Sequence, residues 1–110
     1  MAAPDNEKML TELFAVIESR KGGDASRSYT AKLFAGGVDK IAEKLGEEAL
    51  ETVIAAVKGS DAELVGESAD LLYHLLVLLA AKGIKPEDVF AELRRREGVS
   101  GIDEKAARKK

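Results

Sequence analysis

The chain has 110 residues and a formal net charge of −3, which is enough sequence for one compact domain and too little for two independently cored ones. Hydrophobic residues make up 45% of it and charged residues 34%, a balance typical of a soluble globular protein. The absence of cysteine excludes disulfides and thiolate zinc sites, and the negative charge with 5% aromatic residues argues against nucleic-acid binding. We therefore expect one domain over residues 1–110, with residues 1–6 and 105–110 loosely ordered.

The sequence carries no pattern that would direct it to a membrane. Residues 1–8 lack the basic-then-apolar order of a signal peptide. The longest apolar run, residues 71–81, contains His74 and is shorter than the roughly 20 residues needed to cross a bilayer. We therefore expect a cytoplasmic protein without a membrane partner.

The first half of the chain has helical periodicity interrupted by pairs of glycines. Residues 6–21 form one amphipathic pattern, with its apolar residues three and four apart: Leu10, Leu13, Phe14 and Ile17. Residues 25–29 are expected to form a loop and residues 30–34 a short helix that a Gly-Gly pair ends. A long helix is predicted over residues 38–58.

The second half of the chain continues with helices that have clear start signals. Ser60 and Glu63 form a capping-box pattern, which predicts the beginning of a helix over residues 61–82. A proline opens a further helix over residues 86–96, and residues 104–110 are expected to be a frayed helical tail. No segment alternates with a period of two. The sequence therefore predicts an all-α fold, a bundle of four to five helices.

The predicted helix over residues 38–58 carries its charges in one narrow stripe. On a helical wheel the stripe is about 100° wide, with apolar residues on both sides of it. Its members are Lys40, Lys44, Glu47, Glu48 and Glu51. An ordinary surface helix has the reverse arrangement, one apolar stripe and a broad polar face.

The predicted helix over residues 61–82 places its acidic residues within an even narrower sector. Glu63, Glu67, Asp70 and His74 fall within about 60° of one another, and nearly everything after Asp70 is apolar. A helix that is apolar all round is buried, so its carboxylates are expected to enter the interior or a deep cleft. Because an unpaired buried charge is costly, a cation is expected there, with Lys44 as a second partner.

The spacing of the carboxylates favours a divalent metal ion. Glu48 and Glu51, like Glu67 and Asp70, are three residues apart and project from one helix surface. The short connection at residues 59–60 makes the two helices antiparallel neighbours. Four carboxylate ligands suit Mg²⁺ or Mn²⁺, whereas zinc and copper prefer imidazole or thiolate.

Simpler interpretations of these residues stay open. A pair of glutamates in so charged a chain can be a solvated helix face, which is the preferred interpretation for Glu43. Glu63 is assigned to the capping box, and Tyr73 to packing or an interface. His74 is expected to pack and hydrogen-bond behind the site rather than bind the metal. A di-iron centre would need a Glu-x-x-His motif on two helices, and that motif is absent because the one His of the chain, His74, stands four residues after Asp70.

Four segments together resemble a known enzyme family. Residues 44–51 (KLGEEALE) and 67–74 (ESADLLYH) resemble the EExxE…ExxD signature of the all-α nucleotide pyrophosphatases. Residues 28–33 (SYTAKL) and 100–108 (SGIDEKAAR) resemble the phosphoribosyl-ATP pyrophosphatases of histidine biosynthesis. The resemblance covers residues 10–108 with its segments in order.

The resemblance implies an activity and a role for each site residue. The activity would be hydrolysis of phosphoribosyl-ATP to phosphoribosyl-AMP and pyrophosphate with Mg²⁺, for which Mn²⁺ could substitute. Glu48, Glu51, Glu67 and Asp70 would bind the metal, and Glu47 or one of these, Glu48 first, would hold or deprotonate the attacking water. Lys44 would contact phosphate, and further substrate contacts are assigned to Arg20, Ser28, Tyr29 and Lys32.

The sequence also predicts self-association, and two other functions stay open. The helix over residues 61–82 has more apolar surface than one small chain can cover, so we expect a homodimer, as the resemblance also implies. One alternative is a house-cleaning nucleoside triphosphate pyrophosphatase, which would share the carboxylates but not the segments at Tyr29 and Ser100. The other is a non-enzymatic helical adaptor whose carboxylates are surface charges.

Overall fold

The protein is built from five helices joined by short connections, with no strand among residues 5–108. The computed structural model describes these residues, apart from the side chains of Glu7 and Glu104. The helices are α1 (Asn6–Ser19), α2 (Tyr29–Lys58), α3 (Asp61–Ala81), α4 (Pro86–Arg95) and α5 (Gly101–Arg108). The predicted all-α fold is confirmed. Loose order was expected of residues 1–6 and 105–110. Of these, residue 6 belongs to α1 and residues 105–108 belong to α5, whereas residues 1–4 and 109–110 lie outside the described part.

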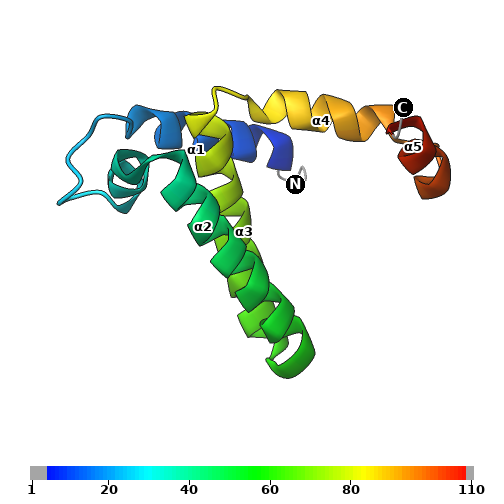
Figure 1. The fold of residues 1–110 in the computed structure, drawn as a ribbon, viewed down its shortest axis with the longest axis horizontal. Coiled ribbons are helices and arrows are strands. Elements are labelled where there is room, and N and C mark those ends of the chain that lie inside the picture. The colour runs from blue at the N-terminus through cyan, green and yellow to red at the C-terminus, as the bar shows by residue number, and fades with distance from the viewer. Residues whose placement is uncertain (1–4, 109–110) are drawn as a thin grey trace.

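Helices α2 and α3 form a long antiparallel hairpin that extends from the rest of the molecule like an arm (Figure 1). The predicted capping box begins α3: the Glu63 N–H donates to Ser60 Oγ at 3.2 Å, and the Ser60 N–H donates to Glu63 Oε1 at 3.4 Å. Because two residues join α2 to α3, each residue of α2 faces a fixed partner on α3. Helix α1 packs against α3, and α4 packs against α1.

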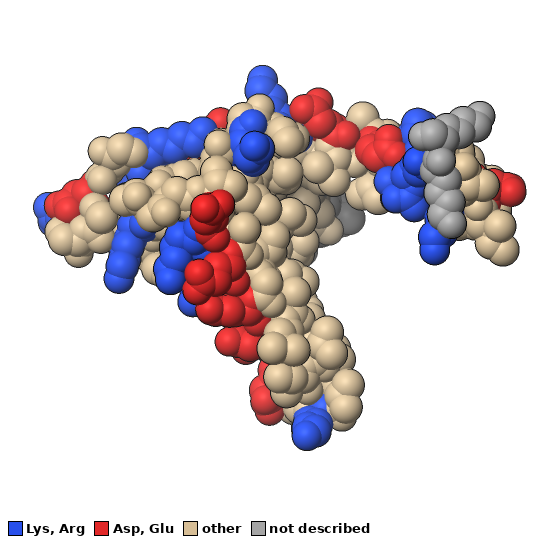
Figure 2. All heavy atoms as spheres, in the orientation of Figure 1, with Lys and Arg blue, Asp and Glu red and all other residues tan. Residues whose placement is uncertain are grey.

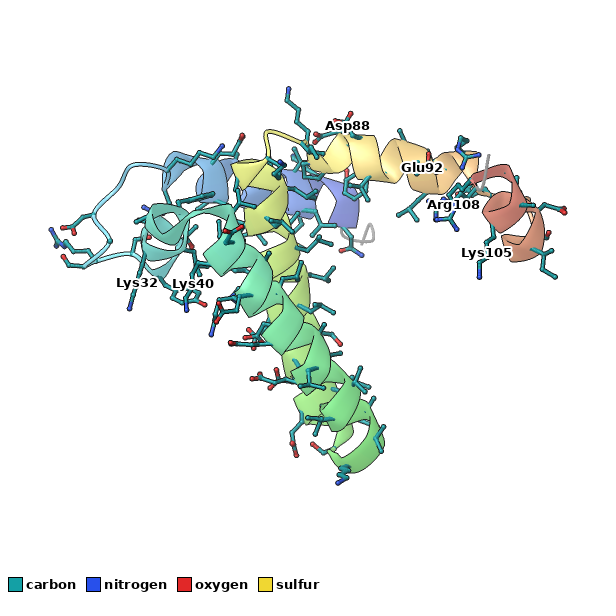
Figure 3. The ribbon with its side chains drawn as sticks, in the orientation of Figure 1. Lys32, Lys40, Asp88, Glu92, Lys105 and Arg108 are labelled. Atoms are coloured by element: carbon teal, nitrogen blue, oxygen red, sulfur yellow. The ribbon has the colours of Figure 1, made fainter. Side chains whose placement is uncertain are left out.

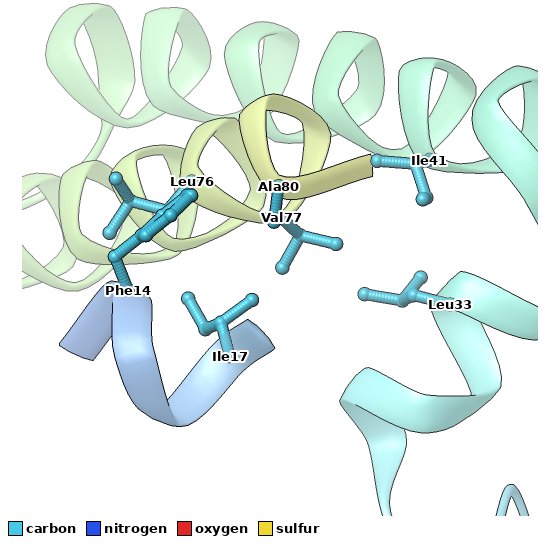
Figure 4. Close-up of a cluster of buried hydrophobic side chains, with 7 residues drawn as sticks. All are labelled: Phe14, Ile17, Leu33, Ile41, Leu76, Val77 and Ala80. Carbon is cyan, nitrogen blue, oxygen red and sulfur yellow. The ribbon is translucent and has the colours of Figure 1, made fainter. Parts of the chain in front are cut away.

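The hydrophobic core lies at the end of the arm where α1, α2 and α3 meet (Figure 4). It contains two residues of α1, two of α2 and three of α3: Phe14, Ile17, Leu33, Ile41, Leu76, Val77 and Ala80. Lys21 closes this end of the core, since its ammonium donates to the carbonyl of Ala80 at 2.6 Å and lies 5.7 Å from the centre of the Phe34 ring. The apolar face predicted for α1 is thus the face that packs.

Helix α2 changes direction at Gly37, where φ is 85° and ψ is 175°. These angles favour glycine, because a Cβ atom would clash with the backbone. The sequence predicted a short helix that a Gly-Gly pair ends. That end is confirmed, because Gly37 has non-helical angles. A second helical segment begins directly after it, so α2 consists of two segments joined at a kink. Its first turn is capped by Ser28, whose Oγ accepts from the N–H of Ala31 at 3.1 Å.

A single chain covers α3 only in part, as expected from its large apolar surface. Val65 and Leu72 are 70% and 52% exposed, although α2 and α1 pack against other parts of the helix. Among the described residues α3 is also the one helix long and apolar enough to cross a membrane, a property that it shares with core helices of soluble proteins. It packs against two other helices of the chain.

The last helix begins earlier than the sequence suggested. A serine followed by glycine predicted a break, and a frayed tail was expected from Glu104. Instead, Ser100 caps α5, since its Oγ accepts from the N–H of Asp103 at 3.1 Å, and the helix runs from Gly101. Serine is both a breaker and a preferred N-cap residue, which explains the difference.

Candidate functional site

Carboxylates from the two facing helices of the arm meet at one place. Oxygen atoms of Glu48 on α2 and of Glu67 and Asp70 on α3 all lie within 4.8 Å of one another. Glu51 joins them, because its carboxylate is close enough to that of Glu67 to raise the pKa of Glu67. Figure 2 shows acidic side chains as a ridge along the arm, with lysine or arginine side chains beside its upper end. The four residues predicted to bind metal are thus neighbours in space.

The site is buried at its base and open at its rim. Glu48 is 9% exposed and Glu67 is half-buried, and each has one oxygen, Oε2, that is buried without a hydrogen-bond partner. Glu51 and Asp70 are exposed. The burial expected for the carboxylates of α3 is therefore wrong for Asp70, whose side chain is exposed in the single chain.

Burial first, and then the crowding of these carboxylates, raises the pKa of Glu48 and of Glu67. The pKa of Glu48 is raised by loss of solvation and then by repulsion from Glu51 and Asp70, which outweigh the nearby His74 and Lys44. The pKa of Glu67 is raised by loss of solvation, by its hydrogen bond to Glu51 and by repulsion from its acidic neighbours. Both groups therefore hold protons more readily than isolated glutamates, and a bound cation would oppose that.

The arrangement fits a hard divalent cation. All the donor atoms are carboxylate oxygens, the kind of ligand that Mg²⁺ and Mn²⁺ prefer. Two of these oxygens, on Glu48 and Glu67, are buried and unpartnered, a costly state that a metal ion would relieve. The residues present could thus hold the metal ion that the sequence predicts.

A chain of hydrogen bonds connects the carboxylate site to the beginning of α2. His74 is 5% exposed, and its Nδ1 lies 2.7 Å from the backbone carbonyl of Asp70. A carbonyl only accepts, so Nδ1 carries the proton and, in the neutral ring, Nε2 accepts from the Tyr29 hydroxyl at 2.9 Å. His74 thereby fixes the position of Tyr29, and it lies behind the site as the sequence suggested.

Two further contacts hold the site together, and the sequence analysis missed both. The Thr30 hydroxyl hydrogen-bonds to the hydroxyl of Tyr73, next to the pair formed by Tyr29 and His74. The Thr52 hydroxyl lies 2.8 Å from the carbonyl of Glu48 and 3.2 Å from that of Glu67, so it bridges α2 and α3 at the carboxylates. The one feature of the sequence that could have revealed these contacts is a polar residue at a predicted helix interface. Such residues are too common to identify a site by themselves.

Lys44 and Glu47 lie at the rim of the site. The Lys44 ammonium donates to Glu47 Oε2 at 3.1 Å, and this contact raises the pKa of Lys44. Lys44 also interacts electrostatically with the Tyr29 hydroxyl and with Glu48. Glu47 is exposed, so it can reach a water molecule or a ligand above the carboxylates.

The other predicted substrate contacts fall in different places. Lys32 lines a cavity together with Tyr29 and Lys44. Ser28 is half-buried, and its hydroxyl caps α2. Arg20 is the exposed C-cap of α1 and does not line that cavity. The structure thus brings Tyr29, Lys32 and Lys44 to the site but not Arg20.

Comparison with known proteins identifies the family of the chain. The sequence model of the family described as phosphoribosyl-ATP pyrophosphohydrolase matches residues 10–97. A protein of Paramagnetospirillum magneticum named phosphoribosyl-ATP pyrophosphatase is 63% identical over 105 residues, which cover 96% of each chain. One of the same name from Parvibaculum lavamentivorans is 66% identical over 99 residues, covering 90% of this chain and 91% of that one. The chain belongs to the phosphoribosyl-ATP pyrophosphohydrolase family of hydrolases.

Proposed function

We propose that this chain hydrolyses phosphoribosyl-ATP to phosphoribosyl-AMP and pyrophosphate in a Mg²⁺-dependent reaction of histidine biosynthesis, as a cytoplasmic enzyme. The observation that carries the metal dependence is the pair of buried, unpartnered oxygens on Glu48 and Glu67. The substrate is supported by relatives of that name at about 60% identity over most of their length. Because the chain belongs to a hydrolase family, the alternative of a non-enzymatic helical adaptor is not favoured.

The carboxylates of the arm would hold the metal. Glu48, Glu51, Glu67 and Asp70 would supply the carboxylate oxygens that hold it, two residues from α2 and two from α3. When bound, Mg²⁺ neutralises phosphate oxygens and lowers the pKa of a bound water. Mn²⁺ has the same preference for oxygen ligands and is expected to substitute.

The residues at the rim would position the substrate and the attacking water. Glu47 is exposed beside the carboxylates and accepts the proton of that water, with Glu48 as the alternative base. Lys44 can exchange its contact with Glu47 for a phosphate oxygen. Because the Tyr29 hydroxyl donates to His74, its oxygen remains free to accept, which suits a ribose hydroxyl better than a phosphate oxygen.

The reaction can be tested by identifying the products directly. Phosphorus NMR of the purified protein with phosphoribosyl-ATP and Mg²⁺ should show phosphoribosyl-AMP and pyrophosphate, and a chelator should stop their formation. Release of orthophosphate instead would mean that water attacks the terminal phosphate. Either that result or turnover that persists with the chelator would contradict the proposed function.

We also propose that the protein acts as a homodimer joined along its arm. Six large apolar side chains of α2 and α3 are half or more exposed there: Leu50, Val53, Ile54, Val57, Val65 and Leu72. The radius of gyration is 16.1 Å, whereas a compact domain of this length has about 13 Å. Both features favour a second copy covering the arm.

The dimer is tested by sedimentation or light scattering at micromolar concentration. The expected mass is twice 11.8 kDa. The substitution Val57→Asp, at a side chain that is 75% exposed, should shift the protein toward monomer, whereas the exposed Val16→Asp on α1 should not. A stable wild-type monomer would contradict the proposal.

A further inference from the structure

The cavity lined by Tyr29, Lys32 and Lys44 lies beside the carboxylate site. It has a volume of about 540 Å³ and is lined by three lysines, which is why we call it the lysine cavity: Lys32, Lys40 and Lys44. Tyr29 also lines it and connects it to His74 and the carboxylates. The rest of its wall consists of small or apolar residues: Leu33, Ala35 and Gly36. It therefore combines cationic groups with an apolar surface.

The kink in α2 creates this cavity. Because the helix turns at Gly37, the segment before the kink, with Lys32, faces the segment after it, with Lys40 and Lys44. Gly36 lets Lys40 lie close to the turn, since a Cβ at Gly36 would come within 3.0 Å of Lys40 Cγ. Figure 3 shows Lys32 and Lys40 extending in the same direction from the two sides of the kink.

The charges of the lysine cavity are available to a ligand. No carboxylate lines it. Lys40 makes an ion pair with Glu43 at 3.6 Å, in which both side chains are more than half exposed, and such surface pairs are worth little. Lys32 makes no ion pair within the described part of the chain. The cavity thus has two cations that an anion can engage.

The lysine cavity and the carboxylates lie in line along α2. Lys40, Lys44 and Glu48 are four residues apart, so they share one face of the helix. Lys40 and Glu48 are eight positions apart, which corresponds to a rise of about 12 Å along the helix. A ligand along this face would have its metal-bound group at one end and a second anionic group at the other.

Phosphoribosyl-ATP has two phosphate-bearing ends, a triphosphate on one ribose and a single phosphate on the other, whereas ATP has only the first. We infer that Lys32 and Lys40 bind the single phosphate of the phosphoribosyl group, an inference that rests on the proposed function. The apolar wall at Leu33 and Ala35 then contacts the adjoining ribose and base. The cavity selects the substrate, and the carboxylates carry out the cleavage.

The test removes the phosphate and the lysines in turn. We would measure kcat/KM with phosphoribosyl-ATP, with ribosyl-ATP, which lacks the distal phosphate, and with ATP, for the wild type and for Lys32→Met and Lys40→Met. Each variant should lose about 10- to 100-fold on phosphoribosyl-ATP, the usual effect of losing a charge-assisted hydrogen bond, and little on the other two. Lys32→Arg should recover part of the loss. Lys8→Met, which removes an exposed lysine of α1, is the matched control.

A binding measurement without metal separates this inference from the proposed function. Ribose 5-phosphate, titrated into the chelator-treated protein, should bind to the wild type and to the Lys8→Met control, and at least 10-fold more weakly to Lys32→Met and Lys40→Met. Equal losses on phosphoribosyl-ATP and ATP, or unchanged binding of ribose 5-phosphate, would overturn the inference. A wild type that releases no pyrophosphate from phosphoribosyl-ATP would overturn the proposed function, and ribose 5-phosphate binding would still decide the role of the cavity.

Discussion

Replacing Glu48 by glutamine should stabilise the metal-free protein and abolish its response to Mg²⁺. Glu48 is nine-tenths buried, and carboxylate oxygens of Glu67 and Asp70 lie within 4.8 Å of one of its own. Two unit charges at that separation repel by about 1 kcal/mol in water and by about 3 kcal/mol at an effective dielectric constant of 20. Glutamine has nearly the same shape without the charge. We therefore expect the free energy of unfolding to rise by about 1–3 kcal/mol.

Thermal unfolding with a chelator and with excess Mg²⁺ measures both effects. In the chelator, Glu48→Gln should melt above the wild type, by about 4–8 °C for each kcal/mol. Mg²⁺ should raise the melting temperature of the wild type, because it binds only the folded protein, and leave that of the variant almost unchanged. Glu12→Gln, at an exposed residue of α1, is the control and should behave as the wild type. The reasoning would be refuted if Glu48→Gln melted below the wild type in the chelator. It would also be refuted if Mg²⁺ raised the melting temperature of the variant as much as that of the wild type.

Three further predictions follow from the same structure. Asp70→Asn should keep the fold, as measured by circular dichroism, and lose at least about 100-fold in turnover at saturating Mg²⁺; wild-type turnover would mean that Asp70 does not serve the metal. Ile17→Ala, at a fully buried core residue, should lower the free energy of unfolding by about 2–5 kcal/mol in urea denaturation, and a loss below 1 kcal/mol would contradict the packing of α1. The raised pKa values of Glu48 and Glu67 mean that the folded protein binds protons more tightly than the unfolded chain, so the metal-free protein loses stability as pH rises from about 4.5 through these pKa values. The advantage of Glu48→Gln in chelator should thus be largest at pH 7 and shrink toward pH 4.5, and a constant difference would count against this linkage.

Much of the fold followed from local signals. The capping box at Ser60 and Glu63 fixed the start of α3, and the glycine after α2 fixed the end of that helix. These patterns are local because they satisfy the free backbone groups of a helix end. The interpretation failed where one residue type has two uses, since Ser100 caps a helix rather than interrupting it.

The helical wheel predicted the carboxylate site because a hairpin with a two-residue connection leaves little freedom in how α2 and α3 face each other. The wheel correctly predicted that Glu48 and Asp70 lie close together. It could not predict how far each is buried, because burial depends on what else covers the arm. The hydrogen bond between Tyr29 and His74 spans 45 residues and requires the chain to turn at Gly37. Periodicity describes each helix separately, so it cannot predict that a kink in α2 brings Tyr29 to a residue of α3.

The most direct test of the account is the ratio of kcat/KM values for phosphoribosyl-ATP and for ordinary triphosphates, measured by pyrophosphate release with one preparation of the enzyme and Mg²⁺. Binding energy from the remote phosphate can align the anhydride for attack, so a substrate without it should lose turnover as well as affinity. We expect efficient release from phosphoribosyl-ATP and much slower release from ATP and deoxynucleoside triphosphates. Equal or higher efficiency on the ordinary triphosphates would contradict the account and identify a house-cleaning pyrophosphatase.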